Sequence, residues 1–159
     1  MPGPLRESQL LNPDFRDILS AFCDENVEFM LVGAYALAAH GLPRATGDLD
    51  LWVARSKDNA RRVRGALARF GAPVSSLTED ELVAPALIFQ IDVEPRRVDI
   101  MTSIDGVEFY QAWKHRLEVE IEGLSIPVIG REELLANKRA AGQPQDLADV
   151  SRLEAQGAR

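Results

Sequence analysis

Residues 29–53 of this 159-residue chain read FMLVGAYALAAHGLPRATGDLDLWV, and this stretch decides the fold. It opens with an apolar run that ends at Gly33, a pattern typical of a buried strand entering a turn. The alanine-rich residues 34–40 predict a short helix, and residues 42–47 predict a loop. The alternation over residues 48–54 predicts a second strand. A strand, a glycine turn, a helix and a strand therefore follow one another within a short span.

Two aspartates sit one strand step apart in the second of these strands. Side chains on a strand alternate between its faces, so Asp48 and Asp50 share one side while Leu49 and Leu51 share the other. Their positions are roughly 6.6 Å apart along the strand, close enough for one or two hard cations to bridge them. Two bare carboxylates this near would repel each other, and bound Mg²⁺ removes that penalty. The alternative is a pair of solvated aspartates on an edge strand.

Asp99 and Gly33 complete the candidate site. Asp99 lies between Val98 and Ile100 and projects from the opposite side of its strand, so a neighbouring position would bring three carboxylates together. Such a triad binds two metal ions, which activate an attacking oxygen and hold a nucleotide triphosphate. Gly33 allows the backbone to approach a phosphate closely, and the helix after it offers free N–H groups.

The remaining chain predicts further helices and strands of one α/β domain spanning residues 1–159, with residues 1–11 as a loosely packed N-terminal segment. A first helix is predicted to begin at Pro13 with Asn12 as its N-cap. The other predicted helices span residues 57–70, 109–113, 131–141 and 146–155. The predicted strands span residues 86–93, 97–103, 117–121 and 124–129, as two hairpins.

Bulk composition narrows the class of protein. The chain is 46% hydrophobic and 27% charged, as expected for a globular protein, and its net charge of -7 argues against coating nucleic acid with the whole surface. Four arginines in the 57–70 helix predict a solvated face or, as an alternative, a local phosphate-binding surface. No apolar run reaches the roughly 20 residues of a membrane helix. With no secretory signal and a single cysteine, Cys23, a cytoplasmic protein is expected.

The stretch from Phe29 to Val53 resembles the opening motif of the polymerase-beta-type nucleotidyltransferase superfamily, in which a strand, a glycine turn and a D-x-D strand recur. The loop before the D-x-D is similar to that of the abortive-infection and toxin–antitoxin nucleotidyltransferases. The residues that carry this likeness are Tyr35, His40, Gly41, Arg44 and Thr46. The similarity extends through residues 97–100, 137–139 and 146–149.

The resemblance implies a fold and a set of roles. The fold would be a mixed, twisted sheet flanked by helices, as in minimal nucleotidyltransferases. Asp48, Asp50 and Asp99 would be the metal ligands and catalytic carboxylates, with Asp99 acting as general base or assisting the metals. Gly33 and the backbone of Ala34 would bind phosphate.

Four more residues are carried over from the likeness. Lys138 would reach the triphosphate as a point charge. Arg44 and Thr46 would contact nucleotide or acceptor, and Asp146 would lie near the site. The implied activity is Mg²⁺-dependent transfer of a nucleoside monophosphate from an NTP to a protein or RNA hydroxyl. Two ions are expected, Mn²⁺ could replace Mg²⁺, and the acceptor would be a small helical toxin or antitoxin partner or a tRNA end.

Three positions depart from the family pattern and keep alternatives open. Ala34 stands where glycine or serine is usual, and Gln143 and Gln145 stand where basic residues are expected. A degenerate module that binds nucleotide or a partner protein without turnover is therefore the main alternative. A metal phosphoesterase is a weaker one, since such sites usually recruit histidines and the chain has only two.

Overall fold

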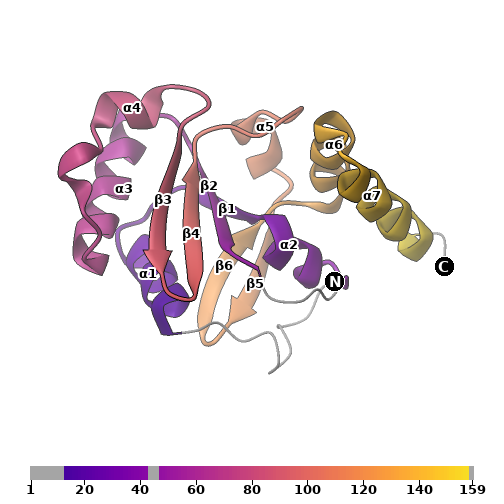
Figure 1. Cartoon of the computed structure of the whole chain (residues 1–159), viewed down its shortest axis with the longest axis horizontal. Helices are drawn as coiled ribbons and strands as arrows, with labels where there is room; N and C mark the ends of the chain where they lie inside the picture. Colours follow the sequence, from indigo (N-terminus) through magenta and orange to yellow (C-terminus); the bar gives the residue numbers. More distant parts are fainter. Residues whose placement is uncertain (1–12, 43–46, 158–159) are drawn as a thin grey trace.

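The computed structural model describes residues 13–42 and 47–157, and its six strands form one mixed sheet in the order β3-β4-β2-β1-β6-β5 (Figure 1). The strands are β1 (Phe29–Val32), β2 (Leu49–Val53), β3 (Ile88–Val93), β4 (Arg96–Met101), β5 (Leu117–Ile121) and β6 (Leu124–Val128). The helices are α1 (Pro13–Asp24), α2 (Gly33–Ala39), α3 (Lys57–Phe70), α4 (Glu79–Val83), α5 (Phe109–Trp113), α6 (Arg131–Ala141) and α7 (Pro144–Gly157). A 3-10 turn, η2, covers Val74–Ser76.

The pairing of the central strands sets the position of every candidate site residue. β1 runs antiparallel to β2 and places Val32 opposite Asp50. β2 runs parallel to β4 and places Asp50 opposite Asp99. β3 then pairs antiparallel with β4, and Gln90 lies opposite Asp99. The predicted mixed α/β sheet is confirmed.

The two faces of the sheet are covered differently. On one face, apolar side chains of β1 and β2 pack against α1 and α3, and the rings of Phe22 and Phe29 meet edge to face at 5.2 Å. On the other face, Trp52 of β2 meets Phe109 of α5 edge to face at 5.1 Å. Figure 1 shows α1, α3 and α4 on one side of the sheet and α5, α6 and α7 on the other. The carboxylates lie on this second face, because they alternate with the packed residues of the first.

A buried asparagine fixes the start of α3 against the sheet. Asn59 is fully buried, and its side-chain amide donates to the carbonyl oxygens of Glu28 and Ala54 at 3.0 and 2.9 Å. Its Oδ1 accepts from the Glu28 N–H at 2.7 Å, and its own N–H donates to the N-cap Ser56 Oγ at 3.0 Å. All of its polar groups are thus bonded, and α3 begins at a defined place beside the end of β2.

The structure corrects several predicted boundaries. β2 begins at Leu49, so Asp48 lies just before the strand, where its carboxylate accepts the Arg97 N–H. β3 begins two residues later than predicted and β4 ends two residues earlier. Ala86, just before β3, has a left-handed backbone with φ of 63°. The last helix starts at Pro144, two residues earlier than predicted, because proline suits a first helical position. Residues 74–83 form η2 and α4, for which no element was predicted.

Some expectations fall on residues that the structure does not describe. The cap Asn12, the segment 1–11, Arg44 and Thr46 all lie outside the described residues. Among residues 13–42 and 47–157, the longest helices are too short or too polar to span a membrane.

Candidate active site

Three carboxylates meet on the α5–α6 face of the sheet because of strand register. Asp50 and Asp99 are direct neighbours on the parallel strands β2 and β4, and neighbouring strands lie about 4.8 Å apart. Asp48 precedes Asp50 by one strand step on the same face. The predicted convergence of Asp48, Asp50 and Asp99 is therefore what the strand pairing produces.

Gly33 is wedged against one of these carboxylates. Its backbone is left-handed, with φ of 72°, and a Cβ built on it would collide with Oδ2 of Asp50. Only glycine combines that backbone with that proximity. The turn between β1 and α2 and the carboxylate of Asp50 are thus in direct contact, so a phosphate at the α2 end would lie beside the carboxylates.

An arginine that was not predicted for the site binds two of the carboxylates. The Arg97 guanidinium donates to Asp99 through Nε at 2.7 Å and through Nη2 at 3.3 Å. The same Nη2 lies 3.4 Å from Asp48 Oδ2, and the Arg97 backbone N–H donates to Asp48 Oδ1 at 3.0 Å. Asp99 in turn raises the pKa of the guanidinium above its ordinary value. Arg97 thus serves as a counter-cation for Asp48 and Asp99.

Within the described residues, Asp50 is the one carboxylate of the three with which Arg97 forms no hydrogen bond or ion pair. Burial, and then the neighbouring charges of Asp99 and Asp48, raise its pKa from 3.8 to about 7, and Arg97 and Lys138 lower it only in part. The three carboxylates thus carry more negative charge than the nearby cations offset, and the effect falls on Asp50.

This shift predicts a pH-dependent stability of the metal-free protein. The folded state binds the Asp50 proton more tightly than the unfolded chain does, so the stabilisation is present below about pH 4 and is lost as the pH rises to about 7. Urea unfolding between pH 5 and 8 in EDTA should show the free energy of unfolding falling with pH. In Asp50→Asn this part of the slope should vanish, whereas Glu120→Gln, which removes an exposed carboxylate from the edge strand β5, should retain it. Equal slopes in wild type and Asp50→Asn would contradict the assignment.

The donor set suits a hard divalent cation. Within residues 13–42 and 47–157, no three His, Cys, Asp or Glu side chains are grouped to hold a metal ion as they stand. The three aspartates nonetheless offer only oxygen ligands, which Mg²⁺ prefers, and the raised pKa of Asp50 marks a place where positive charge is needed. Arg97 already provides such charge to two of the three. The residues fit Mg²⁺ on the condition that Arg97 moves away from Asp48 and Asp99.

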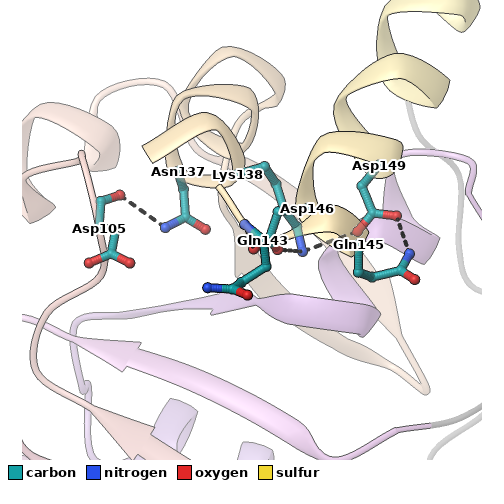
Figure 2. A network of polar contacts seen from close by, with 7 residues as sticks. All are labelled: Asp105, Asn137, Lys138, Gln143, Gln145, Asp146 and Asp149. Carbon is teal, nitrogen blue, oxygen red and sulfur yellow. Dashed lines mark hydrogen bonds and ion pairs between the residues drawn. The ribbon is translucent and has the colours of Figure 1, made fainter. Parts of the chain in front are cut away.

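Lys138 lies in a polar network between α6 and α7 (Figure 2). Its Nζ is 3.3 Å from Asp146 Oδ1 and 3.2 Å from Asp149 Oδ2, and Asp149 is fully buried. Lys138 also lowers the pKa of Asp50, so its charge acts on the carboxylate site. The two α7 carboxylates hold this ammonium in place.

The two glutamines of the network take part in it as neutral groups. Gln145 Nε2 donates to Asp149 Oδ1 at 3.1 Å, and the Gln143 backbone N–H donates to Asp146 Oδ2 at 3.2 Å (Figure 2). A basic side chain at either position would add charge beside Lys138. The network keeps a single ammonium between two carboxylates.

Comparison with known proteins supports the architecture. No protein-family model and no curated protein matches the chain. Among solved structures, the Thermotoga maritima protein TM1012, provisionally assigned as a nucleotidyltransferase, matches with a TM-score of 0.59 and 18% identity over 96% of this chain and 97% of that one. ANT(2")-Ia, solved with adenylyl-2"-tobramycin, matches with a TM-score of 0.59 and 15% identity over 91% of this chain and 87% of that one. The fold is the nucleotidyltransferase fold.

Within this nucleotidyltransferase fold, most of the predicted site residues lie together. Gly33, the three aspartates and Lys138 surround one place on the sheet, and Asp146 contacts Lys138. Ala34 lies beside the D-x-D loop, since a Cβ added at Gly47 would be 3.6 Å from its own. Arg97 and Asp149 were missed. Arg97 could have been found, because a residue two before Asp99 on a strand shares its face.

Proposed function

We propose that this protein is a metal-dependent nucleotidyltransferase that moves a nucleoside monophosphate from an NTP to an acceptor hydroxyl. The observation that carries the proposal is the contact between Gly33 and Asp50, with Asp99 in register beside them. It brings a phosphate-accepting turn and a cation-accepting carboxylate set into one place. Neither a helix end nor an acidic pair alone would do so.

The proposed roles follow from position. Asp48, Asp50 and Asp99 hold one or two Mg²⁺ ions, or Mn²⁺, which would neutralise the triphosphate and lower the pKa of the attacking hydroxyl. Gly33 and the backbone N–H of Ala34 seat the phosphates, and Lys138 adds a positive charge. For Arg44 and Thr46, which precede the aspartates in the sequence, contact with nucleotide or acceptor is proposed from the resemblance alone.

The proposed reaction is a single displacement at the α-phosphorus of the NTP. The acceptor oxygen forms a bond to that phosphorus, the bond to the bridging oxygen of the β-phosphate breaks, and pyrophosphate leaves. Asp99 takes the acceptor proton. Since Arg97 now donates to both oxygens of Asp99, at least one of these hydrogen bonds must be released first.

The acceptor and the biological setting are also proposed. A protein hydroxyl of a small helical partner, or the end of a tRNA, fits the resemblance to toxin–antitoxin nucleotidyltransferases, and a cytoplasmic location fits the single cysteine. The net charge of -7 favours a protein acceptor over a large RNA unless local cations contribute.

A binding module without turnover is the second candidate, and a specific observation favours it. Arg97 already forms ion pairs with Asp48 and Asp99, and Ala34 has no hydroxyl to bind phosphate. If Arg97 stays in place, nucleotide could bind at Gly33 without a complete metal site.

A labelling experiment separates the two. The full chain is incubated with Mg²⁺, candidate acceptors and an NTP labelled either at the α- or at the γ-phosphate. Nucleotidyl transfer moves the α label to the acceptor and releases the γ label in pyrophosphate. Transfer of the γ label would indicate a kinase and overturn the proposal, and nucleotide binding with no transfer across protein and RNA acceptors would favour the binding module.

Replacing Lys138 tests the phosphate contact. Lys138→Met should raise the KM for NTP by about ten- to a hundred-fold, because a charge-assisted phosphate contact is lost. It should also destabilise the fold, because the buried Asp149 loses a neighbouring cation.

The double variant Lys138→Met/Asp149→Asn separates these effects. It should regain much of the stability in urea unfolding, since the buried charge is gone, while the KM stays high. Arg139→Met is the matched control, because Arg139 is on the same helix but exposed and paired with Glu154. A normal KM in the double variant would remove Lys138 from the nucleotide site.

A further inference from the structure

An open cavity of about 640 Å³ lies at the end of β2 away from Gly33. Trp52, Phe109 and Tyr110 line it together with Arg55 and Ser56 at the start of α3. Nothing in the proposed chemistry of the carboxylates uses this cavity. None of the three carboxylates lines it, and its link to them is Trp52, two residues after Asp50 on β2.

The cavity and the phosphate turn flank Asp50 on opposite sides. Along β1 and β2, Val32 pairs with Asp50 and Met30 pairs with Trp52, so Gly33 and Trp52 lie in opposite directions from Asp50. Trp52 shares the face of Asp50 and is roughly 6.6 Å along the strand from it. In phosphoryl transfer the attacking and leaving oxygens lie in line on opposite sides of the phosphorus. With pyrophosphate at Gly33, an acceptor approaches from the Trp52 side.

Most polar groups of the cavity wall are already engaged. The Thr102 hydroxyl donates to the Ala84 carbonyl oxygen at 2.7 Å and accepts the Leu87 N–H at 3.0 Å. Glu108 accepts the Tyr110 N–H at 2.8 Å, and its charge is the one acidic group among the lining residues. These bonds hold the wall together, and the second oxygen of Glu108 is left as its negatively charged acceptor.

Two further polar groups of the wall are donors. Trp52 is 1% exposed, and its indole N–H has no hydrogen-bond partner within the described part of the chain. Arg55 is exposed and makes no ion pair with any described residue. It also directly precedes the N-cap of α3, a 14-residue helix whose N-terminus carries partial positive charge. A cation, a buried donor and a helix N-terminus together favour an anion.

We infer that this cavity seats the acceptor of the transfer reaction, and that the acceptor carries a phosphate group bound at Arg55. The part of this inference that concerns the acceptor rests on the proposed function. Phosphate binding at Arg55 does not, and it can be tested without NTP or metal. The exposed ring of Tyr110 packs against the rest of the acceptor, and the acceptor's hydroxyl extends to Asp99.

Tryptophan fluorescence can report on this seat. The chain has two tryptophans, so Trp113→Phe leaves Trp52 as the reporter, with the stacked contact to Phe109 kept by another aromatic ring. Inorganic phosphate is titrated into this protein in EDTA, with acetate at the same ionic strength as a second probe. Phosphate should change the Trp52 emission saturably and acetate should not.

Three further substitutions locate the binding. Arg55→Gln should weaken phosphate binding by about ten-fold or more. Arg62→Gln removes the same charge from an exposed position on α3 and should leave the affinity unchanged, as should Lys138→Gln at the nucleotide seat. Equal losses in Arg55→Gln and Arg62→Gln would indicate general charge attraction, and a loss in Lys138→Gln alone would place the phosphate at Gly33. Either result, an unchanged emission, or equal binding of acetate would overturn the inference.

The source of the phosphate is resolved by competition. Adenosine 5′-monophosphate and a single-stranded adenosine oligonucleotide are each added against bound inorganic phosphate in EDTA. If the mononucleotide displaces phosphate at the lower concentration, a small phosphorylated acceptor is supported. If the oligonucleotide does so, the end of a nucleic acid is supported. Displacement by neither overturns the acceptor assignment. Failure of the α-label experiment with phosphate binding intact would instead reject the proposed transfer and leave the seat standing.

Discussion

Asp50→Asn is expected to reduce nucleotidyl transfer by at least about a thousand-fold, or ~4 kcal/mol of transition-state stabilisation. Burial raises the pKa of Asp50, and its carboxylate touches the Gly33 turn. An amide keeps the shape but loses the charge that a divalent cation needs. The loss should appear in the rate with saturating NTP, and in weaker Mn²⁺ binding measured by electron paramagnetic resonance.

A matched variant distinguishes this loss from a general change in charge. Glu120→Gln removes an exposed carboxylate from β5, the strand at the opposite edge of the sheet from β3. It should leave transfer and Mn²⁺ binding within about two-fold of wild type, since surface substitutions away from special features have small effects. Asp50→Asn should also be at least as stable as wild type at pH 8 without metal. A stable Asp50→Asn protein that keeps its activity would remove this residue from the mechanism.

Gly33→Ala is expected to abolish activity and nucleotide binding together. A left-handed backbone costs a non-glycine residue about 1–2 kcal/mol, and here the added methyl group also collides with the Asp50 carboxylate. Either the turn or the carboxylate must shift. Isothermal titration with an NTP and Mg²⁺ should show the loss of binding, and thermal unfolding should show a lower midpoint.

Gly71→Ala separates the backbone cost from the collision. Gly71 has φ of 98° at the end of α3, and a Cβ there meets nothing within 4 Å. This variant should lose about 1–2 kcal/mol of stability through its backbone and retain full nucleotide binding. If Gly33→Ala lost stability but kept nucleotide binding, as expected for Gly71→Ala, the contact between the turn and Asp50 would not be needed for binding.

Much of the fold could be predicted because local patterns and tertiary structure agree. The α3 and α6 helices have the predicted bounds, since each has an apolar stripe and a glycine C-cap in the left-handed conformation. The strands of residues 86–103 were predicted too long, because alternation alone does not reveal the left-handed residue Ala86. The short α4 escaped prediction, since five residues carry little periodicity, although its capping box at Thr78 was a usable signal.

The candidate site was predictable in composition but not in charge balance. Strand alternation places Asp48 and Asp50 on one face, and the third carboxylate requires only that β4 lies beside β2. The bond of Arg97 to Asp99 follows from their spacing on one strand, whereas its contacts with Asp48 depend on the pairing of β2 with β4, which no local pattern encodes. The double pairing of Lys138 likewise depends on how α7 folds back on α6.

The contact between Gly33 and Asp50 also bears on substrate selectivity. In the proposed reaction these two residues meet only the phosphates and the metal, which ATP, GTP, CTP and UTP have in common. A rigid junction of this kind cannot read the base. Any discrimination among the four nucleotides has to come from side chains that reach past the ribose, so this junction can be kept unchanged while the choice of base is altered elsewhere in the chain.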